Sequence, residues 1–270
     1  MNFLNIRVSL ILLLLSSSSA FSQLLPSRSL VTDKEITGFS IDRTDNVFIA
    51  FEGGAITKYN DALDSMVSFS SVRVGNYNLI EAWHGFQIFA FNEQFQDYIL
   101  LDRFLTRETR FTLGETGLLF INLGTISSDQ NLWLLEENQL LLSKYNIKSR
   151  ELEISVPLEQ VIDNSDHNFS FMKEYQNLLF LADKSTGIYV FDNLGNFLRK
   201  IETIGALHFS FYNESLYFLN ANVLHEVNLY SNESTEFTLS KNDYIGVLAK
   251  DKKVLLIRKN GLDEYLLKKN

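Results

Sequence analysis

Residues 41–60, IDRTDNVFIAFEGGAITKYN, contain two short apolar segments that are separated by a glycine pair. Similar stretches occur as NLWLLEENQLLLSKYN at residues 131–146 and as NLLFLADKSTGIYVFDN at residues 177–193. Short runs of β-branched and aromatic residues, bounded by Gly, Asn and Asp, are typical of strands joined by tight turns. The chain therefore repeats one β-hairpin.

The repeat has a regular period along the chain. A strongly apolar strand begins six times, at intervals of 38 to 46 residues, at Val47, Ile88, Leu132, Leu178, Leu216 and Val254. A second strand follows each time, and its marker residue lies 11 to 13 residues later, at Tyr59, Leu101, Tyr145, Phe191, Val227 and Tyr265. A period of this length indicates a repeat architecture in which each unit is one supersecondary element.

Most units also have a strand before and a strand after this hairpin. In the first, second and fourth units these strands are predicted at 37–42 and 64–70, at 78–83 and 108–113, and at 168–175 and 196–202. Four antiparallel strands in about 40 residues form a β-propeller blade. We therefore predict an all-β fold, a single six-bladed β-propeller of four-stranded antiparallel blades.

The sixth unit has room for only three strands, at about 245–250, 253–259 and 262–268. Residues 25–35, before the first unit, show a strand-like alternation at Arg28, Leu30 and Thr32. We expect this N-terminal strand to supply the missing outer strand of the sixth blade. It would then close the ring and cover an edge that would otherwise be open to other chains.

The repeat also resembles a known family. Asp-x-x-x-Asn, three hydrophobic residues, a Gly-containing turn and then hydrophobic-x-x-(Tyr/Phe)-(Asn/Asp) resembles the blade repeats of six-bladed propellers. The NHL repeat and the propeller repeat of two-component sensor proteins are similar in style. Residues 46–60, 131–146 and 177–193 carry the resemblance best. It implies one propeller domain over residues 24–270, and it is a resemblance of fold only.

Composition excludes several classes of site. The formal net charge is −9 and the Lys and Arg residues are scattered, whereas nucleic-acid binding relies on clustered basic residues. We therefore expect no nucleic-acid partner. The chain has no cysteine, which excludes disulfides, thiolate metal sites and cysteine nucleophiles.

The first 22 residues have the three parts of a secretory signal peptide. Arg7 precedes the apolar run VSLILLLL at 8–15, and Ala20 and Ser22 are small residues at the positions that a signal peptidase requires. We predict cleavage before Gln23 and an exported protein that is periplasmic or secreted. The apolar run is too short to span a bilayer, and we expect no transmembrane helix after cleavage.

Acidic residues recur where the second strand of a blade turns into the third. Glu52, Glu93, Glu137 and Asp183 occupy this position, and equivalent positions on successive blades form a ring around one face. Ligands usually bind at such a loop-bearing face, and carboxylate oxygens suit Ca²⁺. Acids are also common turn residues, so both explanations stay open. Aromatic residues of the loops could stack on sugars or peptides; these are Tyr77, Phe95, Phe120 and Tyr244.

No catalytic motif accompanies this ring. The chain has no Gly-x-Ser-x-Gly, His-Glu-x-x-His or phosphate-binding glycine loop, and its four histidines lack metal-ligand spacing. We expect a non-catalytic binding or scaffold protein of the bacterial cell envelope, without a cofactor and monomeric, that recognises a protein or glycan with one rim. A fragment of a sensor is disfavoured, since no transmembrane helix or signalling domain follows.

The alternative is a metal-dependent hydrolase with Ca²⁺ or another divalent cation in the central channel. The acidic ring is loosely similar to the channel lining of metal-dependent lactonases of the six-bladed class. Such an enzyme needs three or more convergent Glu, Asp or Asn side chains in the channel. The innermost strands offer few carboxylates, and these lie near the far ends, at Asp42, Glu81, Asp129 and Glu174.

Overall fold

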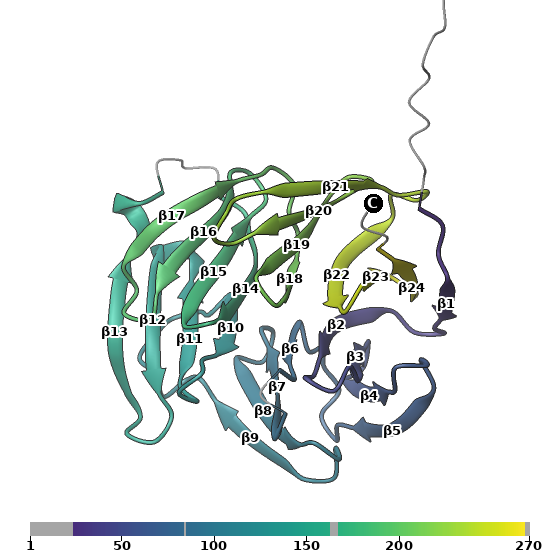
Figure 1. Cartoon of the computed structure of the whole chain (residues 1–270). Coiled ribbons are helices and arrows are strands. Elements are labelled where there is room, and N and C mark those ends of the chain that lie inside the picture. The colour runs from purple at the N-terminus through teal and green to yellow at the C-terminus, as the bar shows by residue number, and fades with distance from the viewer. Residues whose placement is uncertain (1–23, 84, 163–166, 268–270) are drawn as a thin grey trace, which may run out of the picture.

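The computed structural model describes residues 24–83, 85–162 and 167–267, which lie mainly in strands and in the turns between them. The strands form six separate four-stranded antiparallel sheets, which are arranged as blades around a ring (Figure 1). The predicted six-bladed β-propeller is therefore confirmed. The predicted signal peptide, residues 1–22, lies outside the described residues.

In five of the blades the strands run in chain order from the centre of the ring outward, and in the sixth the outer strand comes from the N-terminal end of the chain. The first three blades contain β2 (Ile36–Ile41), β3 (Val47–Phe51), β4 (Ala55–Tyr59) and β5 (Ser65–Ser70); β6 (Leu79–Glu81), β7 (Gln87–Asn92), β8 (Asp97–Asp102) and β9 (Glu108–Thr112); and β10 (Leu123–Ile126), β11 (Leu132–Glu136), β12 (Leu141–Asn146) and β13 (Glu151–Pro157). The next two contain β14 (Phe169–Tyr175), β15 (Leu178–Asp183), β16 (Gly187–Asp192) and β17 (Phe197–Glu202); and β18 (Phe209–Tyr212), β19 (Ser215–Asn220), β20 (Val223–Asn228) and β21 (Ser234–Thr238). The sixth contains β22 (Tyr244–Lys250), β23 (Lys253–Arg258), β24 (Gly261–Leu266) and β1 (Arg28–Val31), and two short 3-10 helices, η1 (Glu137–Gln139) and η2 (Leu158–Gln160), follow β11 and β13.

The residues that mark the sequence repeat are partners in the sheets. In the first blade Val47 lies opposite Tyr59, and in the sixth Val254 lies opposite Tyr265. The same holds for the second, third and fifth blades, whereas in the fourth the pairing moves by one residue and Leu179 faces Phe191. The period in the sequence is therefore the register of each blade's central hairpin.

The Asn or Asp that follows each marker closes the next turn. The Asp192 carboxylate accepts hydrogen bonds from the backbone N–H groups of Leu194 and Asn196, both at 2.9 Å. Asn60, Asp102, Asn146 and Asn228 accept similar bonds in their own blades. Short Asx side chains readily hydrogen-bond to backbone groups two or more residues ahead, which explains this part of the motif.

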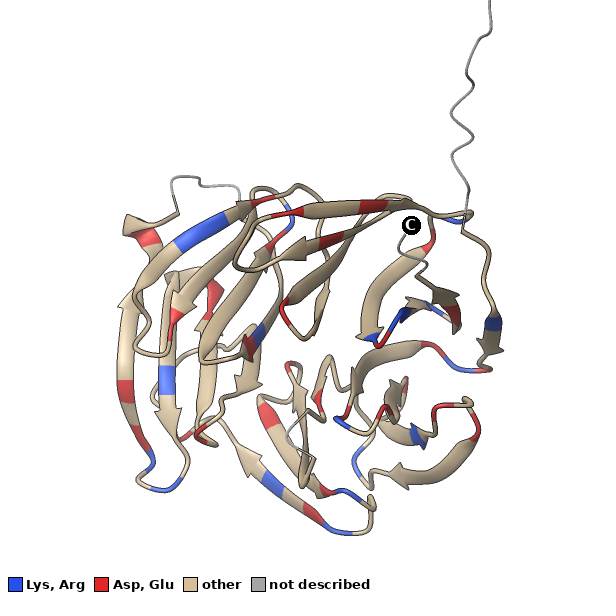
Figure 2. Cartoon of the chain, in the orientation of Figure 1, with Lys and Arg blue, Asp and Glu red and all other residues tan. Residues whose placement is uncertain are grey.

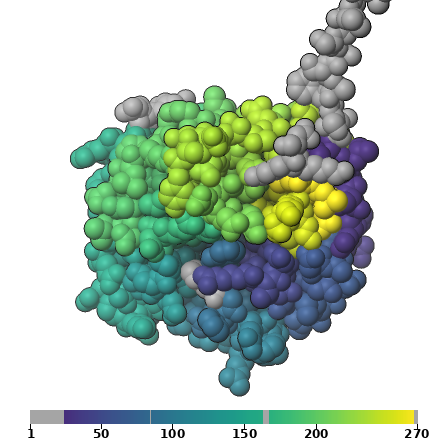
Figure 3. All heavy atoms as spheres, in the orientation of Figure 1, coloured from purple at the N-terminus to yellow at the C-terminus, as the bar shows by residue number. Residues whose placement is uncertain are grey.

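The sixth blade lacks this turn residue because its outer strand comes from the other end of the chain. Leu266 follows the marker there, and β24 pairs in antiparallel fashion with β1, with Leu30 opposite Leu262. Figure 3 shows the same arrangement, since purple N-terminal atoms lie against yellow C-terminal atoms. The N-terminal segment thus takes the outer position of this blade.

A glycine opens β24 and permits the close approach of β1. Gly261 has φ +146°, and a Cβ built on it would lie 2.3 Å from the Leu30 carbonyl oxygen. Gly187 opens β16 in the same way, with a Cβ position 2.3 Å from the carbonyl oxygen of Ile201 in the outer strand β17. β1 therefore approaches its neighbour as the outer strand of the fourth blade approaches its own.

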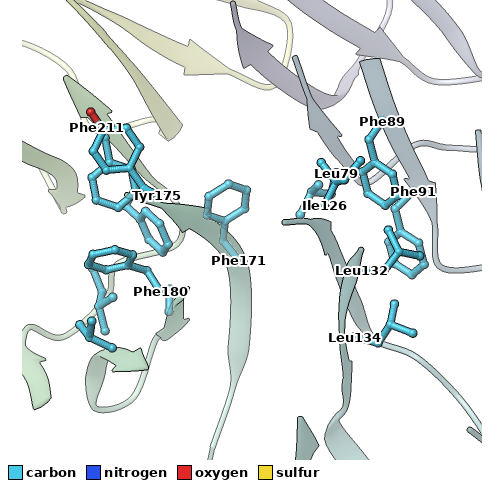
Figure 4. Close-up of a cluster of buried hydrophobic side chains, with 14 of the residues drawn as sticks. Leu79, Phe89, Phe91, Ile126, Leu132, Leu134, Phe171, Tyr175, Phe180 and Phe211 are labelled. Carbon is cyan, nitrogen blue, oxygen red and sulfur yellow. The ribbon is translucent and has the colours of Figure 1, made fainter. Parts of the chain in front are cut away.

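The blades pack face to face through their second strands. All five residues of β3 and of β11 are buried, because neighbouring blades cover both faces of these strands. The largest buried apolar cluster spans the second to fifth blades, and Figure 4 shows two parts of it, one around Tyr175, Phe180 and Phe211 and one around Leu79 and Phe91. The apolar burial that stabilises the fold is thus shared between blades.

No described helix is long and apolar enough to cross a membrane. Acidic and basic side chains are scattered over the blades and turns, and Figure 2 shows no concentration of Lys and Arg on one element.

Replacement of Gly261 by Ala tests the packing of β1 against β24. The new methyl would contact the Leu30 carbonyl oxygen, and an L-residue is strained at this φ. We expect a loss of about 3 kcal/mol in the free energy of unfolding, which lowers Tm by roughly 10 °C. The control is Gly53→Ala, since Gly53 has φ +90° but no atom within 4 Å of the added methyl. Thermal melts of both variants measure the effect. An equal loss of stability in the two variants would show that the contact between the new methyl and β1 does not destabilise the fold.

Candidate functional site

A cavity of about 330 Å³ opens at the centre of the ring, at the end where the innermost strands begin. Five consecutive blades contribute to its wall, which is lined by Thr37, Asn78, Leu79, Phe91, Glu93, Asn122, Leu123, Glu137, Phe169, Ser170, Phe171, Lys184 and Leu207. The cavity is therefore the mouth of the central channel, on the face that carries the turns between second and third strands.

Two of the predicted site residues meet at this mouth. Asn122 lies between them, because its Nδ2 donates to Glu93 Oε1 at 3.4 Å and its Oδ1 accepts from the Glu137 backbone N–H at 2.9 Å. Glu137 Oε1 also accepts from the backbone N–H of Phe169 at 3.4 Å. The turns after β7 and β11 thus present two carboxylates to one cavity, linked by an amide from the start of β10.

The surroundings of Glu93 disfavour its charged form. Burial raises the pKa of Glu93, and the nearby charge of Glu137 raises it further, while the Asn122 hydrogen bond acts in the opposite direction. No ion pair to Glu93 or Glu137 is formed by any residue that the structure describes. Lys184 is the one basic residue in the described wall of the cavity, and it too lacks an ion-pair partner there. The mouth therefore has an excess of negative charge that is not neutralised.

The other two predicted site residues do not line this cavity. Asp183 is fully buried at the end of β15, where it accepts hydrogen bonds from the backbone N–H groups of Asn168 at 3.1 Å and Ser185 at 2.8 Å. Glu52 is exposed in the turn after β3, away from the residues that form the wall. Asp183 therefore uses its carboxylate to hold its own turn, and the fourth blade contributes Lys184 to the wall of the cavity instead.

Aromatic side chains and one histidine narrow the channel behind the mouth. The His208 ring lies 4.0 Å from that of Phe171 and 4.5 Å from that of Phe39, measured between ring centroids. Gly246 makes room for them, since a Cβ there would lie 2.2 Å from Phe39. Burial, with the charge of Lys173, lowers the pKa of His208 to about 3, so the imidazole is neutral near pH 7. Its Nδ1 is buried and has no hydrogen-bond partner among the described residues.

The carboxylates at the far ends of the inner strands all have internal partners. Glu81 accepts from Lys173 Nζ at 2.9 Å, and Glu174 accepts from Trp133 Nε1 at 2.7 Å. Asp42 holds the turn before β3, with a bond of 2.8 Å from the Thr44 N–H, and Asp129 pairs with Lys144. Among the described residues no group of three or more His, Asp or Glu side chains could hold a metal ion.

The loop aromatics that could have stacked on a ligand are mostly occupied. Tyr77 and Tyr244 are buried. The hydroxyl oxygens of Tyr244 and Tyr265 lie 2.7 Å apart and share a hydrogen bond. Phe95 lies under the guanidinium of Arg73, at 3.8 Å from the ring centroid. Phe120 remains exposed. The structure therefore contradicts the expectation of an aromatic platform for Tyr77 and Tyr244.

Sequence reasoning missed Asn122, Lys184 and His208. A signal for the first existed, because the pair Asn-Leu stands at the start of two inner strands, as Asn78-Leu79 and Asn122-Leu123, and the cavity uses all four residues. Lys184 directly follows β15, at the position that Glu52, Glu93, Glu137 and Lys259 take after β3, β7, β11 and β23, and the one-residue move of the fourth blade hid this match. His208 has no such repeat.

Comparison with solved structures agrees with the class that the fold and the channel define, a six-bladed β-propeller. The chain is similar to the β-propeller domain of Cps50 (Swd1) from Myceliophteria thermophila, with a TM-score of 0.66 and 9% identity over 91% of this chain and 100% of that one. It is similar to a catalytically inactive His-to-Ala variant of virginiamycin B lyase from Staphylococcus aureus with quinupristin, with a TM-score of 0.61 and 15% identity over 89% and 88%. The extracellular domain of a one-component or hybrid two-component system from B. thetaiotaomicron gives a TM-score of 0.57 and 16% identity, over 86% of this chain and 33% of that one.

These likenesses are of fold, because every identity is low. No family model matches the chain, and no curated protein matches its sequence.

Replacement of Glu93 by Gln should stabilise the protein near neutral pH. The folded-state pKa of Glu93 lies above its unfolded value, so ionisation on going to neutral pH costs folding free energy, and the cost is absent where the carboxyl is protonated in both states. We expect Tm to rise by about 2 °C at pH 7 and to match the parent at pH 4.

Glu115→Gln is the control, since Glu115 is exposed and pairs with Arg150 at 3.1 Å. Thermal melts at both pH values measure the difference. A lower Tm for the Glu93→Gln variant at pH 7 would mean that the charge of Glu93 stabilises the fold.

Proposed function

We propose that the protein is a non-catalytic binding protein of the bacterial cell envelope, and that it binds its partner at the mouth of the central channel. The observation that carries this proposal is the cavity itself. It is open, it is built by five blades, and neither of its two carboxylates forms an ion pair with a described residue, although Lys184 lies in the same wall. Partly buried carboxylates without an ion-pair partner lower the stability of a fold. Such a cost is typical of a site at which a ligand uses the charged groups.

The N-terminal residues support the envelope location. The order of Arg7, an apolar run and small residues before Gln23 is that of an exported protein. A propeller of the same fold is the extracellular domain of the B. thetaiotaomicron protein, so this architecture serves outside the cell in that case. For this chain the location is a proposal.

A metal-dependent hydrolase of lactones or related esters is the second candidate. The oxygens of Glu93, Glu137 and Asn122 are of the kind that Ca²⁺ prefers, and they face one cavity. Propellers of this fold can be enzymes, as the lyase structures are. The fold does not distinguish the two candidates, so the test must do so.

The first experiment places a photoreactive residue at the channel mouth in the producing cell. p-Benzoylphenylalanine replaces Leu207, which lines the cavity, and in the control it replaces Leu194, which is exposed in the turn after β16. We expect one cross-linked product of defined mass, in the envelope fraction, from position 207 only. No product, or the same product from both positions, would contradict binding at the mouth.

Metal addition separates the second candidate. The chain from Gln23 onward is melted with EDTA and then with Ca²⁺, Zn²⁺ or Mn²⁺, and the binding proposal predicts an unchanged Tm. A cation at 100 times its dissociation constant would stabilise the fold by about 2.7 kcal/mol. Such a shift, lost in Glu93→Gln and accompanied by lactone hydrolysis, would establish the hydrolase instead.

A further inference from the structure

Exposed apolar side chains, here called the rim, lie on three loops that join the outer strand of one blade to the inner strand of the next, and one of them, Leu207, lines the cavity. The loops 71–78, 113–122 and 203–208, which connect successive blades, carry the large apolar side chains Val72, Val74, Leu119, Phe120, Ile204 and Leu207. Val72 is 98% exposed, Leu119 80% and Ile204 68%. Water-facing apolar groups gathered around one cavity are characteristic of a surface that a partner covers.

Hydrogen bonds hold these three loops against the turns that form the site. The backbone N–H of Gly205 donates to the Lys184 carbonyl oxygen at 2.8 Å, and that of Ile121 donates to Gln96 Oε1 at 2.8 Å. Asn76 Oδ1 accepts from the Gly53 N–H at 3.1 Å. The apolar side chains are therefore fixed on the same face as Glu93 and Glu137 and are not on free loops.

Charge within this rim is complementary to a cation. Glu93 and Glu137 share one cavity, and Lys184, the basic residue of the same wall, forms no ion pair with either carboxylate. Arg73, on the rim, is engaged by Asp97 at 3.0 Å and by the Phe95 ring. Behind the carboxylates lies the neutral ring of His208, whose buried Nδ1 still needs a polar partner.

We propose that the partner is a protein segment with a Lys or Arg side chain that enters the cavity between Glu93 and Glu137, flanked by apolar residues that cover Val72, Leu119 and Leu207. An ammonium or guanidinium group would supply the ion-pair partner that neither carboxylate has among the described residues, beside the long hydrogen bonds of 3.4 Å that each already accepts. The inference rests on the proposed binding function and specifies its ligand.

A glycan fits this mouth less well. Sugars stack on aromatic faces, and in the three loops the aromatic residues are Tyr77, which is buried, and Phe120. Phe95, in the neighbouring turn between β7 and β8, lies under Arg73. The aliphatic Val, Leu and Ile side chains of the rim pair instead with apolar side chains of a polypeptide. The chemistry of the rim and of the cavity together points to a basic-apolar peptide.

Selection from a phage-displayed random dodecapeptide library tests this inference on the intact chain from Gln23 onward. We expect enrichment of peptides in which Lys or Arg is flanked by apolar residues, and no enrichment on the Glu93→Gln/Glu137→Gln variant. Calorimetry of one selected peptide should show affinity that falls roughly tenfold in that variant, because a charge pair is lost, and that also falls in Leu119→Ser.

Two controls keep the result interpretable. The Glu151→Gln variant, which changes an exposed residue of the outer strand β13, should bind the peptide as the parent does, and replacement of the peptide's basic residue by Glu should abolish binding. Thermal melts establish that each variant is folded. Enrichment of acidic or uncharged peptides, the same affinity in the double variant, or binding on a glycan array without any peptide enrichment would overturn the inference.

The test separates this inference from the proposed function. Cross-linking at position 207 without enrichment of basic peptides would leave binding at the mouth in place and refute the basic ligand. Failure of both, with Tm and lactone hydrolysis responding to a divalent cation, would refute both proposals together.

Discussion

The pairing of β1 with β24 joins residues that are more than 200 positions apart and completes the sixth blade. It also completes a buried polar cluster. Asp263 in β24 accepts from Ser29 Oγ in β1 at 2.6 Å, from Lys241 Nζ at 2.8 Å and from Tyr244 Oη at 2.7 Å. Burial acts to raise the pKa of Asp263, but these hydrogen bonds lower it to about 2, so the carboxylate is charged near neutral pH. Without β1 this buried charge would lose one of its donors and its cover.

Closure of the ring sets the shape of the channel. Each inner strand packs between two neighbours, and the bond from the Ala82 N–H to Ser40 Oγ, at 3.0 Å, links the first two blades. The equivalent bond from Ala249 to Ser210, also 3.0 Å, links the last two. The mouth depends on this continuity, since one cavity takes Thr37 from the first blade and Leu207 from the fifth. A ring open at the sixth blade would let these walls separate.

Most of the fold could be predicted from the sequence because it depends on short-range chemistry. The apolar hairpin recurs in all six blades, and an Asx residue closes the next turn in five of them. In the sixth blade Leu266 stands where the Asx residue would be, and this is the blade that the N-terminal strand completes. Register follows directly, except in the fourth blade, where Leu178 and Leu179 are both apolar and the pairing moves by one residue. Adjacent apolar residues cannot be distinguished by pattern in a strand that is buried on both faces.

The site could be predicted only in part, because it depends on where side chains point. Asp183 is the last residue of β15, as Asn92 is of β7, and the side-chain oxygen of each accepts a backbone N–H of its own turn. Glu93 and Lys184 are the next residues, and both line the cavity. The sequence pattern aligned Asp183 with Glu93 because the pairing in the fourth blade moves by one residue. His208 was unforeseeable for another reason, because its position depends on the space that Gly246 leaves in a different blade.

Hydrogen exchange measured by mass spectrometry tests ring closure most directly. The chain from Gln23 onward is compared with one that begins at Lys34 and therefore lacks β1, and exchange is followed in peptides that cover β24 and, as the reference, β15. The account predicts rapid exchange of β24 and a lower Tm without β1, with a smaller change in β15. Equal protection of β24 in the two chains, at an unchanged Tm, would contradict closure of the ring by the N-terminal strand.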